Sequence, residues 1–295
     1  MEKSIRQLNL EDLHYLKKMK TGIEDDYILR VYNRIASGSS RLYGLFQEGQ
    51  LASIGGYTIF AGQYAMLGRM RSDLRYRGNN LSTQLMAHIM EEAFALPAVQ
   101  WVGANTQQDN GSARRVMDKL GLAEVSTLYS AISLDVAPLE TGGAVWQAVS
   151  ELSQKKEWIN RLYIKTGAVF PYECYYAFPA SQALFADAEL AQWSFFENPD
   201  KSRVLIAKKD YKGNHFLHAV YPWHDLMEQT GLWETISLAQ RQLNAQVKTE
   251  ALIWIDLSPE QVATLPENHP FDLPSPWLLY GTGRSSCKLN GSSFH

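Results

Sequence analysis

The chain of 295 residues is poor in three things: long apolar runs, cysteine and excess positive charge. No apolar run reaches the ~18–20 residues that a membrane-spanning helix needs. The stretch Met1 to Gln7 is polar and has no signal-peptide core, so we expect a cytoplasmic protein without a membrane partner. The only cysteines, Cys174 and Cys287, have neither metal-binding nor redox spacing, which fits a reducing compartment.

The charge balance argues against a nucleic-acid partner. The formal net charge is −3, and residues 1–135 carry 15 basic and 14 acidic side chains. Nucleic-acid-binding domains instead show a clear basic excess. With 45% hydrophobic and 20% charged residues the composition is that of a globular protein, and the length predicts two domains.

The first half has the pattern of a mixed α/β domain, in which helical spacing alternates with the period of two typical of strands. We place this domain at residues 1–135. Its helices are expected at 5–18, 25–36, 81–94 and 110–120, and its strands at 41–47, 50–60, 64–72, 99–105 and 126–134.

Residues 136–143, rich in Gly and Pro, are interpreted as a linker. A second α/β domain is expected at 144–283, followed by a loose tail at 284–295. This domain repeats the order of elements of the first half in weaker form. Its helices are expected at 145–166, 234–245 and, as a short helix, 259–265. Its strands are expected at 173–178, 191–197, 203–209, 215–221, 251–257 and 277–280.

The most informative stretch is the turn Leu74-Arg75-Tyr76-Arg77-Gly78-Asn79-Asn80, between an expected strand and the helix that begins at Leu81. The first amides of a helix have no intrahelical partners and carry partial positive charge. A turn of Gly and Asn at that place, with arginines beside it, predicts a binding site for a phosphate group.

A second motif lies on the helix at 110–120: Asn110-x-x-Ala113-x-x-x-Met117-x-x-x-Gly121-Leu122. Together with Arg75-x-x-Gly78-x-Asn80, it resembles the GCN5-related N-acetyltransferase (GNAT) superfamily. The resemblance covers about residues 4–134. It implies the GNAT fold, a mixed and mostly antiparallel sheet with splayed central strands. The second half resembles a degenerate GNAT-like domain.

The resemblance further implies acetyl-CoA as co-substrate, with no metal. The acetyl group would pass by direct attack, in a ternary complex, to a primary amine of a small molecule. The protein would be a monomer or a homodimer. The residues carried over to CoA binding are Met70, Ser72, Leu74, Arg75, Arg77, Gly78, Asn79, Asn80, Leu81, Ser82, Asn110 and Ala113.

The proton donor to the leaving thiolate is less well defined. Met117 stands where the family often has Tyr, and a thioether cannot donate a proton. Tyr64 and Tyr129 are the candidate catalytic residues in its place, and packing is the alternative role of both. Asp73 and Asp109 are base candidates by chemistry alone.

Three charged residues are candidates for acceptor binding. Arg69 and Arg71 lie on one face of the strand 64–72, where they bind a substrate carboxylate or form a solvated face. Glu24 lies at a helix start, where it attracts a cationic amine or only complements the helix dipole.

The second half offers Trp223 to Gly231 at the place of the phosphate turn. This stretch has no arginine and two acids, so we expect no CoA there. His215 and His218 are expected on opposite faces of a strand, so they would not bind the same metal ion. Two other functional classes remain open: a non-catalytic acyl-CoA-binding or sensing module, and an acyltransferase with a different acyl group or acceptor.

Overall fold

The computed structural model describes residues 2–286, which divide into two compact units. The first unit takes the chain as far as Val125, together with the C-terminal segment that begins at Leu279. The second unit runs from Ser126 to Leu278. The division differs from the one expected from the sequence in two places. Residues 126–135, expected in the first domain, belong to the second unit, and the strand residues 279–283 belong to the first.

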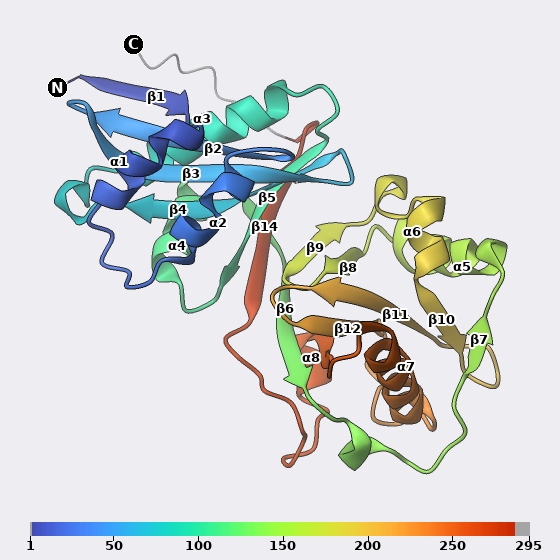
Figure 1. The fold of residues 1–295 in the computed structure, drawn as a ribbon. Helices are drawn as coiled ribbons and strands as arrows, with labels where there is room; N and C mark the ends of the chain where they lie inside the picture. Colours follow the sequence, from blue (N-terminus) through green and yellow to red (C-terminus); the bar gives the residue numbers. More distant parts are fainter. Residues whose placement is uncertain (1, 287–295) are drawn as a thin grey trace. The chain divides into compact units, whose positions relative to one another are not determined.

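The first unit is built on a sheet with the strand order β1-β2-β3-β4-β5-β14 (Figure 1). Neighbouring strands are antiparallel from β1 to β4, whereas β4 and β5 are parallel. The strands expected at 41–47, 50–60, 64–72 and 99–105 are confirmed. The bounds are β1 (Lys3–Gln7), β2 (Ser40–Gln47), β3 (Gln50–Phe60), β4 (Tyr64–Ser72), β5 (Trp101–Gln107) and β14 (Trp277–Gly283).

Helices cover both faces of this sheet. They are α1 (Leu13–Lys18), α2 (Tyr27–Ile35), α3 (Leu81–Ala95) and α4 (Gly111–Lys119). The first two share a core with β2 and β3 that includes Leu16, Tyr32 and Ile54. The next residue, Gly55, points to the opposite face, where a Cβ atom would lie 2.6 Å from Sδ of Met86 in α3.

The helix expected over 5–18 is wrong at its start. Residues 3–7 form β1, which pairs with the edge of β2 in the register Ile5 opposite Leu45. Asn9 then caps a 3-10 helix (Leu10–Asp12) that leads into α1. The apolar spacing of the leucines fits a helix, but pairing with the open edge of β2 satisfies the backbone groups of residues 3–7 instead.

The second unit repeats the central elements of the first. Its sheet has the order β7-β10-β11-β12-β13-β6, antiparallel except for the parallel pair β12 and β13, which α7 connects. The bounds are β6 (Ala123–Ser133), β7 (Gln147–Val149), α5 (Leu152–Ile159), α6 (Asp187–Gln192), β10 (Ser194–Glu197), β11 (Val204–Tyr211), β12 (His215–Val220), α7 (Leu232–Val247), β13 (Leu252–Leu257) and α8 (Pro259–Val262).

Two expectations for the second unit are wrong in detail. The helix expected over 145–166 is divided into β7, α5 and a π-helical turn (Asn160–Ile164). The strand expected over 173–178 is a hairpin of β8 (Val169–Glu173) and β9 (Tyr176–Pro179), because Tyr175 adopts a left-handed conformation with φ 71°. The apolar residues of 173–178 fit a continuous strand, so their pattern does not indicate a turn at Tyr175.

Candidate functional site

The parallel strands β4 and β5 separate partway along their length. Their pairing joins Tyr64–Leu67 to Trp101–Ala104, although β4 continues to Ser72. On its other side β4 has a bulge, where the register with β3 shifts between Ile54 and Gly56 and Arg69 has φ 61°. The expectation of splayed central strands is therefore confirmed. Beyond Leu67, the edge of β4 that faces β5 is no longer paired with β5.

The turn after β4 leads to a helix whose N-terminus carries no side-chain cap. Gly78 has φ 87°, and Asn80, the N-cap residue of α3, has φ 57°. The helices α2 and α4, by contrast, are capped by Asp26 and Asn110. A Cβ atom on Gly78 would have no other heavy atom within 4 Å, so the space in front of the turn is open. Uncapped amides beside open space suit an anion.

Asp73 braces this turn. Its fully buried carboxylate accepts hydrogen bonds from the amides of Lys20 (3.0 Å) and Arg75 (2.9 Å). It also accepts two from the Arg75 guanidinium, at 2.9 and 2.6 Å. The Arg75 guanidinium holds the pKa of Asp73 well below its usual range, with help from the two amides. A carboxylate so stabilised in its charged form is a poor base, and Arg75 is directed to it.

We expect Asp73→Ala to destabilise the first unit by about 2–4 kcal/mol, because two backbone amides lose their acceptor and each unpaired donor costs about 1–3 kcal/mol. Thermal unfolding at neutral pH measures the effect. The control is Arg30→Ala in α2, which removes the exposed partner of Asp25 and should change stability by less than about 0.5 kcal/mol.

The pH dependence of that difference follows from the lowered pKa of Asp73. A carboxyl whose folded-state pKa is depressed contributes stability above its unfolded pKa and loses it as pH falls through the folded-state value. The difference in Tm between wild type and Asp73→Ala should therefore stay constant down to about pH 4 and shrink below it. A difference that already vanishes between pH 7 and pH 5 would contradict the assignment.

Of the other residues predicted for CoA binding, Ser72 and Ser82 lie beside this turn, whereas Asn110 and Ala113 lie at the start of α4. Ser72 and Ser82 share a hydrogen bond of 2.6 Å between β4 and α3. Asn110 caps α4 by accepting from the amide of Ala113 at 3.2 Å. Lys119, which the motifs did not single out, donates from Nζ to Asn80 Oδ1 at 2.8 Å.

The lysine therefore adds a cation at the start of α3. Nothing in its local sequence points to it, since only the packing of α3 and α4 brings it there. Arg77 also lies at this turn, exposed, with Nη2 3.4 Å from the carbonyl of Thr21.

The residues predicted for acceptor binding have local partners. Arg71 forms a two-pronged ion pair with Asp26 at 2.6 and 2.9 Å, and Asp26 also caps α2. This guanidinium lowers the pKa of Asp26. Arg69 donates to Thr58 Oγ1 at 2.6 Å, whereas Glu24 is exposed before α2. Arg71 thus ties α2 to β4 beside the bulge.

The tyrosines predicted as proton donors belong to different units. Tyr64 is buried against Trp101, with ring centroids 6.0 Å apart, at the paired end of β4. Tyr129 belongs to the second unit, where it lies opposite Leu257. Met117 is 1% exposed and lies in the core. Tyr64 therefore packs in the core of the first unit, at the end of β4 away from the turn.

In the second unit, the start of α7 is covered. Glu234 accepts from the amides of Thr141 (2.6 Å) and Gly143 (2.9 Å), which fixes the linker there. A Cβ atom on Gly231, the N-cap residue, would lie 2.1 Å from the carbonyl oxygen of Ala144. The linker thus fills the place that corresponds to the open space before α3.

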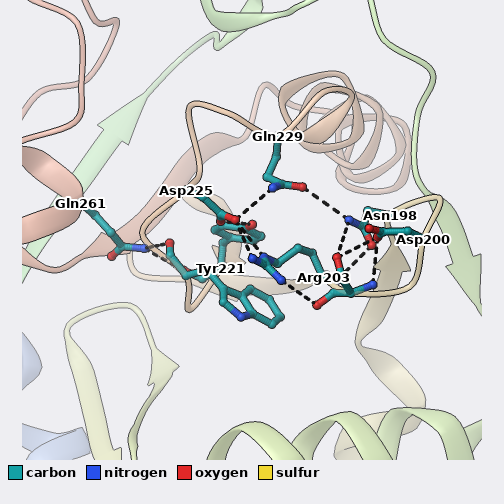
Figure 2. A network of polar contacts seen from close by, with 9 residues as sticks. Asn198, Asp200, Arg203, Tyr221, Asp225, Gln229 and Gln261 are labelled. Atoms are coloured by element: carbon teal, nitrogen blue, oxygen red, sulfur yellow. Dashed lines mark hydrogen bonds and ion pairs between the residues drawn. The ribbon is translucent and has the colours of Figure 1, made fainter.

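The turn before α7 also holds its own carboxylate. Figure 2 shows Arg203, Tyr221 and Gln229 converging on Asp225, at 2.9, 2.6 and 3.0 Å. Asp225 therefore uses the local cation and donors that a phosphate group would need. The second unit has the order of elements of the first without its open turn.

Comparison with known proteins agrees with this geometry. Residues 4–122 match the model of the acetyltransferase (GNAT) family. No curated protein sequence matches the chain. A putative acetyltransferase structure from Thermoplasma acidophilum is 14% identical, with a TM-score of 0.54, covering 95% of this chain and 99% of its own.

A second structural neighbour is a putative acetyltransferase from Pyrococcus horikoshii. It is 11% identical, with a TM-score of 0.52 and coverage of 95% and 89%. A GCN5-related N-acetyltransferase from Sphaerobacter thermophilus is 13% identical, with a TM-score of 0.51 and coverage of 95% of both chains. These likenesses show the fold over both units. With the splayed strands and the uncapped turn, the family match shows that residues 4–122 form a domain of the acetyltransferase (GNAT) family.

Proposed function

We propose that the first unit binds acetyl-CoA and transfers its acetyl group to a primary amine of a small molecule. The observation that carries the proposal is the uncapped start of α3 behind Gly78, next to the splayed edge of β4. The amides from Gly78 to Ser82 would hold the pyrophosphate, assisted by Lys119 and Arg77. The edge of β4 from Arg69 to Ser72 would run beside the pantetheine arm.

The chemistry follows from that placement. A backbone amide at the bulge around Arg69 and Met70 would polarise the thioester carbonyl, as preorganised donors do for developing negative charge. Holding amine and thioester in one site supplies much of the rate. The amine must be neutral to attack, and its proton leaves through water to solvent. The CoA thiolate is a good leaving group, so transfer does not require a side chain in place of Met117.

One observation favours a second candidate, an acyl-CoA-binding module without transfer. The buried thioether of Met117 occupies the position of the family's proton donor. A protein that only senses acyl-CoA would need the turn at Gly78 but no donor. An acyltransferase with another acyl group would need both the turn and an acceptor site.

The test combines binding with turnover. CoA binding is measured by calorimetry. Release of free thiol is then measured from acetyl-, propionyl- and succinyl-CoA with amino acids, diamines, aromatic amines and a peptide N-terminus. We expect CoA binding and thiol release from acetyl-CoA above hydrolysis with at least one small amine. Binding without release across the panel supports the sensing module. Absence of CoA binding contradicts both.

A further inference from the structure

A polar cluster is buried in the second unit, on the face of the sheet opposite α7. Leu217 and Ile253 pack toward α7, while Phe216 and Trp254 form a separate cluster with Cys174 from the β8–β9 turn. Ligand atoms of Cys174, Asp210 and His218 all lie within 4.8 Å of one another. Cys174 and His218 are fully buried.

The ring nitrogens of His218 have unequal surroundings. Nε2 lies 2.7 Å from Oδ2 of Asp256, which also accepts from Trp254 Nε1 at 3.1 Å. Nδ1 is buried and has no hydrogen-bond partner among the described residues. A proton on Nε2, donated to Asp256, leaves a lone pair on Nδ1. An unpaired buried nitrogen is costly in a folded protein, so it calls for a ligand.

We propose that Cys174, Asp210 and His218 form a binding site for a divalent transition-metal ion such as Zn²⁺, with Asp256 orienting His218. Thiolate sulfur, imidazole nitrogen and carboxylate oxygen are the ligands that zinc takes, and a water completes four-coordination. The hydrogen bond from His218 to Asp256 is the contact that usually fixes a metal-bound histidine.

The geometry requires only a small contraction. Bonds of about 2.0–2.3 Å in a tetrahedral zinc site place ligand atoms roughly 3.3–3.8 Å apart. The three side chains therefore need to approach by about 1 Å. The Cys174 thiol is now hydrogen-bonded to Asp210, and its proton would be released to solvent as the sulfur–metal bond forms.

The charges of the pocket also suit a dication. Lys212 forms ion pairs with Glu173 at 2.6 Å and, more loosely, with Asp210 at 3.5 Å, so its charge balances one of these two carboxylates. The Lys208 ammonium is turned to the hairpin, with Nζ 2.5 Å from the carbonyl of Pro171. With Cys174 as thiolate, the other carboxylate, Asp256 and the thiolate are three negative charges that face Lys208 and the dication, so their sum is zero. A buried site avoids the cost of an unbalanced charge in this way.

The site would join the β8–β9 hairpin to β11 and β12, and its role would be to hold the hairpin on the sheet. This proposal does not depend on acetyl transfer in the first unit. The sequence did not reveal the site because its ligands come from three separate segments, and the alternation of His215 and His218 pointed away from a shared metal.

The test uses the full chain without an affinity tag, carrying Cys287→Ser so that Cys174 is the only thiol. After treatment with a chelator, Co²⁺ is added and the thiolate-to-cobalt charge-transfer absorption is followed, with Zn²⁺ as competitor. We expect one ion per chain. Cys174→Ala and His218→Ala should each remove the absorption. Asp256→Asn should weaken binding by about 10–100-fold without abolishing it.

His224→Ala, which changes an exposed histidine of the same unit, is the matched control and should bind as the parent does. Asp210→Asn keeps the side-chain shape and serves where an alanine variant does not fold; it should also weaken binding. A parent protein that is folded but takes up no Co²⁺ or Zn²⁺ overturns the proposal. So does an absorption that persists in Cys174→Ala.

Discussion

Replacing Gly78 with valine should lower the affinity of the chain for CoA by roughly 100-fold or more, since losing two charge-assisted hydrogen bonds costs about 3 kcal/mol or more. The glycine has φ 87°, and a Cβ atom there would project into the open space before α3. A branched side chain would occupy the space in which the amides are proposed to receive the pyrophosphate. Calorimetric titration with CoA measures the loss.

Gly62→Val is the matched control. This glycine lies in the turn between β3 and β4, has φ 70°, and likewise has no heavy atom within 4 Å of an added Cβ. Both variants should lose similar stability, about 1–2 kcal/mol for a left-handed residue with a side chain. Only Gly78→Val should lose CoA binding. Unchanged CoA affinity in Gly78→Val would remove the turn from the binding site.

The same titration gives the stoichiometry. Wild type should bind one CoA per chain, because the linker covers the start of α7 and Asp225 holds Arg203 in the turn before it. Gly78→Val should bind none at the same concentrations. A second equivalent that survives in Gly78→Val would place a CoA site in the second unit.

The sequence predicted the conformation of the turn before α3, because that feature is local. Glycine and asparagine are the residue types that most readily adopt left-handed conformations, and Gly78 and Asn80 of this turn adopt them. Strands of the first unit with clear alternation were also placed well. These features depend on backbone preferences of a few neighbouring residues, so a single sequence contains them.

Contacts with residues distant in the chain do not follow from the sequence pattern. Asp73 is a base candidate by residue type alone, and its contact with the amide of Lys20, 53 residues earlier in the chain, appears only in the fold. Arg71 stays a candidate for substrate binding, and its ion pair with Asp26, 45 residues away in the chain, could not be predicted from the strand pattern. Lys119 meets Asn80 only because α4 packs beside α3. Pairings of this kind are set by tertiary packing, which no periodic pattern encodes.

The last strand shows the same limit, and it can be tested. The pattern of Trp277–Tyr280 predicts a strand but does not show which strand it pairs with. The domain boundary expected from the sequence places this strand in the second domain. In the structure, residues 279–283 belong to the first unit, where β14 lies beside β5 (Figure 1). The ring of Trp101 lies against Gly281: a Cβ atom added to Gly281 would lie only 2.0 Å from Cζ2 of Trp101.

Gly281→Val should therefore destabilise the first unit by about 3 kcal/mol, since the side chain must displace a buried tryptophan from a packed core. Thermal unfolding should show a decrease in Tm of roughly 10 °C. Gly283→Val is the control on the same strand, where an added Cβ would meet no atom closer than 3.9 Å. If Gly281→Val matched Gly283→Val in Tm and CoA affinity, β14 would not complete the first unit. A selective loss in Gly281→Val would show that the stability of the first unit depends on β14.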